Sequence, residues 1–196
     1  MQPCYDEAKR RKMIMRIIII GILLGVFGCS SPPVNRDAAT PLTTVDYVDT
    51  ERYLGRWYEI ARFPNRFEKG CEGVTADYAL RDDGLISVIN TCRKGSPEGE
   101  AKAAKGRARI VDTSTNAKLE VSFFGPFWGD YWVIGLAEDY SLALVGEPSG
   151  RYLWILSRTP MISDEVREKA VSDLRGMGYN TDALYWTEQE AGRPKS

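Results

Sequence analysis

The stretch YLGRWYEIARF (residues 53–63) begins the series of short segments that decides the fold. Apolar and polar residues alternate in it and in the segments that follow, which is the pattern of half-buried strands. Short turns rich in Gly, Asn, Asp and Pro separate the segments, as at Asp82-Asp83-Gly84, where glycine tolerates the positive φ of a hairpin turn. Strands are therefore predicted at 57–62, 71–80, 85–92, 106–111, 118–124, 130–137, 141–147 and 151–157.

Eight successive strands with short connections predict an antiparallel meander that closes into a sandwich or a barrel. An eight-stranded barrel leaves an interior that can hold one small ligand. The pattern changes after Pro160, where Ser163 can cap a helix and Gly178 can end it. Between them, apolar residues recur at helical spacing: Val166, Ala170, Leu174 and Met177. One further strand is predicted at 184–187, and residues 191–196 are a polar tail.

Residues 1–28 have the composition of an export signal. Five Lys or Arg residues precede twelve uncharged residues, 17–28, a run shorter than the ~20 residues that a membrane-spanning helix requires. Val26-Phe27-Gly28-Cys29 resembles the lipobox of bacterial lipoproteins, which implies cleavage before Cys29 and acylation of Cys29. Ser30 then implies delivery to the outer membrane. An ordinary signal or a signal anchor with an incidental cysteine is the alternative.

Residues 29–44 are polar, contain three prolines and predict a flexible, lipidated tether. The domain itself is expected to span residues 45–190, a length typical of a single domain. Removal of residues 1–28 takes away five basic and two acidic residues, which changes the net charge from −1 to −4. This mildly acidic balance argues against nucleic acid as a partner.

The cysteines indicate an oxidising compartment. One lies in the signal and Cys29 is assigned to lipid, which leaves Cys71 and Cys92 as an even pair and predicts a disulfide between them. Regular pairing of the hairpin would place Cys71 opposite residue 94 or 95, so the bridge requires a bulge or a loop position for Cys71. The chain contains no histidine, which argues against zinc and haem sites and against nucleophiles activated by histidine. No metal, cofactor or catalytic residue is predicted.

Three motifs resemble those of the lipocalin family and occur in the same order. Gly55-Arg56-Trp57-Tyr58 is similar to the family's GxW signature at the first strand, Gly129-Asp130-Tyr131 to its second motif, and Arg158 to its third. The resemblance covers residues 45–186, and it is closest to the bacterial outer-membrane members of the family at 53–63, 121–127 and 152–166. It implies an eight-stranded antiparallel up-and-down barrel with one C-terminal helix and a final strand.

The resemblance also implies roles for particular residues. Trp57 closes the narrow end of the barrel, Arg158 lies across its indole, and Gly55 turns the chain into the first strand, so these three residues are structural. If Arg158 points inward, alternation along each strand places an apolar and aromatic set on the inner wall. The predicted ligand-binding residues are Val74, Ala76, Tyr78, Val121, Phe123, Tyr131, Val133 and Trp154.

Such a lining suits a fatty acid or a lysophospholipid, which is the ligand class that the resemblance implies. The implied location is the outer membrane of a Gram-negative bacterium, with the anchored barrel facing the periplasm, and a homodimer stays open. Two other functions also stay open: a lipid-modifying enzyme on the same scaffold, and a structural envelope lipoprotein. Against the enzyme, Glu59, Glu68 and Glu72 are expected to be solvated rather than catalytic.

Overall fold

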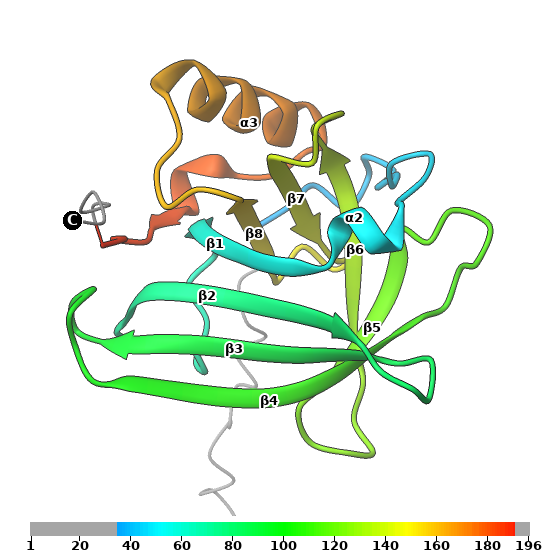
Figure 1. Ribbon diagram of the computed structural model, residues 1–196. Helices are drawn as coiled ribbons and strands as arrows, with labels where there is room; N and C mark the ends of the chain where they lie inside the picture. Colours follow the sequence, from blue (N-terminus) through cyan, green and yellow to red (C-terminus); the bar gives the residue numbers. More distant parts are fainter. Residues whose placement is uncertain (1–34, 191–196) are drawn as a thin grey trace, which may run out of the picture. The chain divides into compact units, whose positions relative to one another are not determined.

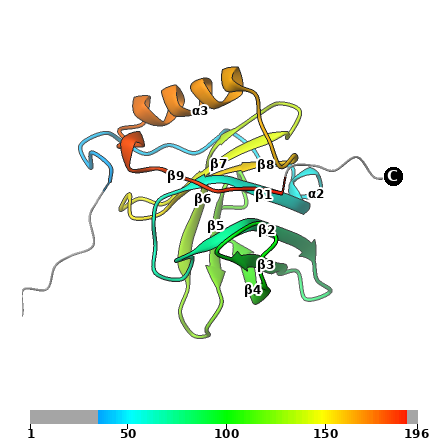
Figure 2. The ribbon, with the colours of Figure 1, turned by 90° about the vertical axis from the view of Figure 1, so that its left-hand side faces the viewer.

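A computed structural model describes residues 35–190, so the predicted signal, Cys29 and the polar tail lie outside the described residues. The strands form one antiparallel sheet that closes on itself (Figures 1 and 2), because β1 (Gly55–Arg62) pairs with both β2 and β8. This confirms the eight-stranded up-and-down barrel. The other seven strands of the barrel are β2 (Cys71–Leu80), β3 (Ile86–Lys94), β4 (Ala101–Ile110), β5 (Lys118–Ser122), β6 (Gly129–Leu136), β7 (Leu142–Gly146) and β8 (Leu153–Ser157).

The barrel has two different ends. The short helix α2 (Thr50–Tyr53) precedes β1, so the end where β1 begins is called the closed end; its turns span 81–85, 111–117 and 137–141. The opposite end is called the mouth, and its turns span 63–70, 95–100, 123–128 and 147–152. In Figure 1 the turn between β3 and β4 lies on the left and α2 on the right.

Helix α3 (Asp164–Gly176) packs against the outer wall of the barrel (Figure 1). The Oγ atom of Ser163 accepts a hydrogen bond from the backbone N–H of Val166 at 3.3 Å, so the predicted cap is confirmed. Ala170 and Leu174 are buried in an apolar cluster with residues of the outer wall, whereas Val166 is exposed. Met177 packs against the same cluster, so Val166 is the one residue of the predicted stripe that does not anchor the helix.

After α3 the chain forms a short 3₁₀ helix, η1 (Thr181–Ala183), and then β9 (Tyr185–Trp186). β9 pairs with the mouth end of β1, opposite Ala61 and Arg62, and confirms the predicted final strand. Among the described residues, no helix is both long enough and apolar enough to span a membrane.

The prediction for the fourth strand was too short. β4 begins at Ala101, five residues before the expected start, and pairs with β3 from Ala101 to Ala108. Residues 101–105 read Ala-Lys-Ala-Ala-Lys and are exposed. They lack the alternation of a half-buried strand because both faces of this part of β4 are accessible to solvent.

The interpretation of residues 29–44 as a flexible tether is wrong for residues 35–44. The backbone N–H of Asn35 donates to the carbonyl oxygen of Gly150 at 3.2 Å, and the Nε of buried Arg36 donates to the carbonyl oxygen of Met177 at 3.0 Å. The guanidinium of Arg36 also lies over the ring of Tyr179. This segment is therefore part of the folded domain, since it satisfies backbone groups at the end of α3 and in a mouth turn.

The disulfide between Cys71 and Cys92 is present, with a Cα–Cα distance of 5.1 Å. Cys71 lies opposite Lys94, one residue closer to Cys92 than the register of the rest of the hairpin would place it, and the bridge runs diagonally to the cysteine two residues along on β3. The register of this hairpin shifts between Glu72 and Thr75, next to the bridge. A closed loop of this size contributes roughly 3 kcal/mol in the chain-entropy model.

Candidate ligand-binding site

The inner wall of the barrel can be read directly from the strand register. Trp57 on β1 lies opposite Ala76, Ala76 lies opposite Asn90, and Asn90 lies opposite Ala104. Residues that lie opposite one another share a face of a sheet. Since Trp57 belongs to the apolar cluster inside the barrel, this whole row faces inward.

The closed end is sealed by Trp57, as predicted. Its indole N–H donates to the carbonyl oxygen of Tyr53 at 2.9 Å, and the guanidinium of Arg158 lies 3.8 Å from the centre of its ring. Arg158 also donates to the carbonyl oxygens of Arg52 and Arg56, at 2.6 and 2.8 Å. The Arg158–Trp57 stacking contributes roughly 1–2 kcal/mol. The motif residues therefore hold α2 across the end of the barrel and are structural.

Three tyrosine hydroxyls meet just inside this seal. The hydroxyl of Tyr131 lies 2.9 Å from that of Tyr53 and 3.1 Å from that of Tyr78. Burial raises the pKa of Tyr78 to about 12, so its hydroxyl stays protonated at neutral pH. Three hydroxyl protons serve two hydrogen bonds among these residues, which leaves one O–H available to an oxygen atom of a ligand.

The enclosed space around these tyrosines is small. An apolar cavity of about 20 Å³ lies between α2 and strands β2–β6. This volume suffices for about one water molecule and is too small for an acyl chain. Its wall includes Tyr53, Tyr78, Tyr131, Ile86, Val88, Ala108, Leu119 and Val121.

Toward the mouth, the inner wall is more open. Two inner residues closer to the mouth pack against the apolar cluster of the barrel and are nevertheless only half-buried: Phe123 and Trp154. Ala104, at the end of the register row, is exposed. In a solid core these side chains would be fully buried, so the mouth half of the barrel is where a ligand has access.

The structure places the predicted ligand-binding residues as follows. Tyr78, Val121 and Tyr131 line the small cavity, and Val133 is fully buried in the core beside it. The remaining four lie on the wall closer to the mouth or next to Trp57: Val74, Ala76, Phe123 and Trp154. Trp154 stacks on Tyr152 with ring centres 5.8 Å apart, and its indole N–H donates to the Glu68 carboxylate at 3.3 Å.

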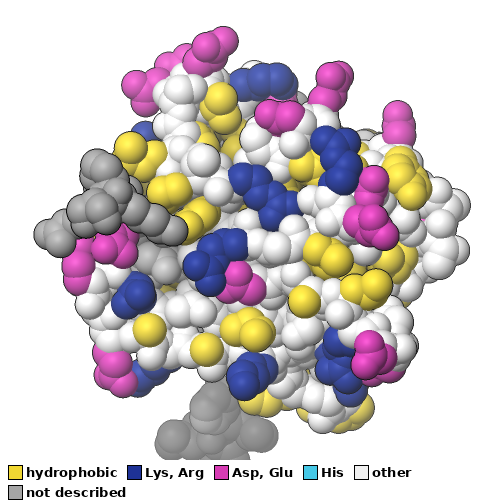
Figure 3. Space-filling model, in the orientation of Figure 1, with side chains coloured by type: hydrophobic (Ala, Val, Ile, Leu, Met, Phe, Trp, Pro, Cys, Tyr) yellow, Lys and Arg dark blue, Asp and Glu magenta, His cyan; other side chains and the backbone are white. Residues whose placement is uncertain are grey.

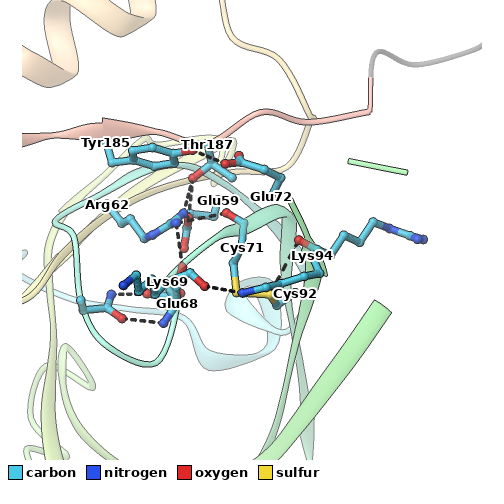
Figure 4. Close-up of a disulfide and its surroundings, with 12 residues drawn as sticks. Glu59, Arg62, Glu68, Lys69, Cys71, Glu72, Cys92, Lys94, Tyr185 and Thr187 are labelled. Carbon is cyan, nitrogen blue, oxygen red and sulfur yellow. Dashed lines mark hydrogen bonds and ion pairs between the residues drawn. A yellow bond between two sulfur atoms is a disulfide. The ribbon is translucent and has the colours of Figure 1, made fainter. Parts of the chain in front are cut away.

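A buried polar network connects the mouth to β9 (Figure 4). The Nη1 atom of Arg62 donates to the Glu59 carboxylate at 2.5 Å and to the hydroxyl of Thr187 at 2.8 Å. Its Nη2 atom donates to the carbonyl oxygens of Glu68 and Cys71, at 3.0 and 3.1 Å. One guanidinium therefore fastens β1, the first mouth turn, β2 and the segment after β9.

The expectation that Glu59, Glu68 and Glu72 are solvated is wrong. They are 2%, 8% and 5% exposed. Glu68 accepts hydrogen bonds from Asn65 and Trp154, and Glu72 accepts from the hydroxyl of Tyr185 and, at 2.7 Å, from the backbone N–H of Glu188. Through these contacts, Glu68 joins the first mouth turn to β8, and Glu72 joins β2 to the C-terminal segment.

Burial and, to a smaller extent, the neighbouring Glu68 carboxylate raise the pKa of Glu59 to about 8 against the opposing effect of Arg62. The guanidinium of Arg62 bonds to the carboxyl of Glu59 but only to the backbone carbonyl oxygen of Glu68. The Glu59 carboxyl therefore retains its proton well above the range in which a solvated carboxyl loses it.

Sequence reasoning missed several inner residues. The predicted inner wall does not include Ile86, Val88 and Asn90, and the structure shows all three on it. The side-chain oxygen of Asn90 is buried and has no hydrogen-bond partner among the described residues. It is the second polar group, after the tyrosine hydroxyls, that a ligand could satisfy. Counting residues from the hairpin turn places Asn90 opposite Ala76, and this pairing is the sequence signal that assigns Asn90 to the inner wall.

The chain belongs to the lipocalin family. It has the closed barrel, the end sealed by a tryptophan, the helix packed on the outer wall and the three motifs that define this class of protein. A family model described as a lipocalin-like domain matches residues 48–189. The chain is 48% identical to outer membrane lipoprotein Blc of Escherichia coli (strain K12), over 84% of this chain and 90% of that protein. It is 41% identical to the Vibrio cholerae protein of that name, over 89% and 97%, and 32% identical to apolipoprotein D of Mus musculus, over 90% and 96%.

Solved structures show the same fold at lower identity. Insecticyanin from the tobacco hornworm Manduca sexta matches with a TM-score of 0.62 and 19% identity, over 76% of this chain and 85% of that one. The cockroach allergen Per a 4 matches with a TM-score of 0.58 and 21% identity, over 79% and 97%.

Proposed function

We propose that this protein is an outer-membrane lipocalin, anchored through acylated Cys29, whose barrel binds a fatty acid or a lysophospholipid. The observation that carries the ligand proposal is the inner wall of the mouth half, which is apolar and aromatic but only half-buried. Burial of each CH₂ of an acyl chain there gains about 0.8 kcal/mol. The relatives named outer membrane lipoprotein Blc support the location and the anchor.

The geometry favours a particular placement of the chain. The cavity beneath the tyrosines is too small for it, so the acyl chain is proposed to lie between Ala104, Phe123 and Trp154, with its inner end near the tyrosine hydroxyls. Asn90, on the wall beside Ala104, can donate its side-chain N–H to an ester or carboxylate oxygen, and its side-chain oxygen can accept from a ligand hydroxyl.

Lipids that co-purify with the protein test the ligand class. Protein extracted from the membrane of a Gram-negative host should release fatty acids or lysophospholipids in near-stoichiometric amounts, as measured by mass spectrometry of the organic extract. Recovery of intact protein that carries no lipid beyond its own acyl chains would favour a structural envelope lipoprotein, and turnover of an added lipid would favour an enzyme.

The anchor is tested separately. A Cys29→Ala variant expressed in the same host should lose its covalent acyl label and leave the membrane fraction, because several acyl chains anchor stably where one chain binds only marginally. Cys4→Ala is the matched control and should stay in the membrane. A Cys29→Ala protein that remains acylated and membrane-bound would show that the lipobox interpretation is wrong.

A further inference from the structure

Three phenylalanines project from the mouth of the barrel. Phe67 lies in the turn between β1 and β2, and Phe124 and Phe127 lie in the turn between β5 and β6. They are 65%, 81% and 76% exposed, and Phe124 and Phe127 have the two highest values among the large apolar side chains of residues 35–190. By contrast, on the side of the molecule shown in Figure 3, basic, acidic and apolar side chains are intermixed.

The exposed rim is continuous with the inner wall. The ring of Phe67 packs against that of Tyr152 with centres 5.6 Å apart, and Tyr152 stacks on Trp154. Trp154 faces the interior of the barrel. Three aromatic rings thus lead from the outermost surface of the mouth to the proposed position of the acyl chain.

The two ends of the barrel differ in charge. The mouth turns that carry the phenylalanines, together with the turn between β7 and β8, have exposed basic side chains and no exposed acidic ones: Arg66, Lys69 and Arg151. The remaining mouth turn has exposed Glu98 and Glu100. The closed-end turns are acidic, with Asp82, Asp83, Asp112, Glu138 and Asp139 against Arg81, which is paired with Asp83. A negatively charged surface would therefore attract most of the mouth and repel the closed end.

The N-terminal segment enters the domain at the mouth. Asn35 is hydrogen-bonded to Gly150 in the turn between β7 and β8. Five residues lie between Cys29 and Asn35, so covalent geometry allows at most about 22 Å between the two. If Cys29 is acylated, as proposed above, the membrane surface lies within that distance of the mouth.

We propose that the rim of the mouth docks on the phospholipid surface of the membrane that holds the acyl chains of Cys29. Phe67, Phe124 and Phe127 enter the interfacial layer, and Arg66, Lys69 and Arg151 contact lipid phosphates. The barrel then opens directly onto the bilayer, and a lipid passes along Phe67, Tyr152 and Trp154 without crossing water. This inference rests on the proposed anchor.

The orientation of the acylated protein on a bilayer tests the inference. The full protein is placed in nanodiscs of phosphatidylcholine and phosphatidylglycerol, of which a small share carries a gadolinium chelate on the headgroup. Backbone amide signals of residues 64–69 and 124–128 should lose the most intensity, and those of residues 82–84 and 112–116 the least. In a Phe124→Ser/Phe127→Ser variant this difference between the ends should disappear, while the acyl chains still hold the protein to the nanodisc.

The matched control is Leu80→Ser/Val111→Ser, which removes two exposed apolar residues from the closed end and should preserve the difference. A stronger signal loss at the closed end, equal loss at both ends, or an unchanged pattern in the phenylalanine variant would overturn the docking inference. A missing acyl mass on Cys29 would refute the anchor instead. In that case, the docking is tested by sedimentation of the unacylated protein with vesicles of the same lipids. Binding that is lost in the Phe124→Ser/Phe127→Ser variant would support the docking. Binding that this variant retains, or no binding by either protein, would overturn it.

Discussion

Replacement of Arg62 by Met is expected to lower the free energy of unfolding by about 3–5 kcal/mol at neutral pH, because it leaves the buried Glu59 carboxyl without its partner and two buried carbonyl oxygens without a donor. Arg62 is 4% exposed and bonds to Glu59, to Thr187 and to two backbone carbonyl oxygens. Urea denaturation of the two proteins measures the difference. Arg56→Met is the matched control: Arg56 also lies on β1 and pairs with Asp77, but the pair is largely exposed, so its loss should cost less than about 1 kcal/mol.

The same network predicts a pH dependence. Because the pKa of Glu59 is raised from 4.5 to about 8, the folded protein holds a proton that the unfolded chain loses within this window. The free energy of unfolding should therefore fall as the pH rises from about 4.5 to about 8, and Glu59→Gln should flatten that slope. Arg62→Met should cost more at pH 8 than at pH 5. Equal losses for Arg62→Met and Arg56→Met at both pH values would contradict the role given to the network.

An Ala104→Trp variant is expected to lose most of its affinity for acyl-chain ligands. Ala104 is exposed and faces the interior opposite Asn90, so an indole there occupies space that the chain would fill. Displacement of about four methylenes corresponds to ~3 kcal/mol, or roughly a 100-fold rise in Kd. Isothermal titration calorimetry with the delipidated protein measures the change.

Ala103→Trp is the control for this experiment, because Ala103 is also exposed but faces outward on the same strand. It should bind like the wild type, and both variants should melt like the wild type. Ala76 is less suitable, because it is buried directly opposite Trp57 and a larger side chain there would press on the seal of the closed end. Equal affinities of the Ala104 and Ala103 variants would place the ligand elsewhere.

The features that the sequence predicts well are those encoded locally. Alternation along the strands and the glycine turns predict most of the barrel, and the position of Arg158 fixes the phase of β8 relative to Trp57. The register of the β2–β3 hairpin from Leu80 to Thr75 follows from counting residues from the turn at Gly84, whereas the shift that brings Cys71 opposite Lys94 does not. Each of these inferences uses only the residues of the two strands that flank a turn.

The features that the sequence does not predict depend on distant partners. Glu59 is buried because Arg62 and Thr187 surround it, and Thr187 lies 128 residues away. Arg36 lies in a stretch with the composition of a linker, yet it is held by Met177 and Tyr179 near the end of α3. Periodicity contains no information on such contacts. The start of β4 is missed for a different reason, since a strand beside an open interior has no buried face to produce a pattern.

Titration of the delipidated protein with saturated fatty acids and lysophospholipids of increasing chain length tests the central claim most directly. Trp154, which is half-buried on the inner wall, provides a fluorescence signal alongside the calorimetry. If the mouth half of the barrel holds the chain, each added CH₂ gains about 0.8 kcal/mol, so affinity should rise roughly fourfold per methylene until the available length is filled, and then level off. An affinity that does not change with chain length, or no binding at any length, would contradict the assignment of the barrel as an acyl-chain site.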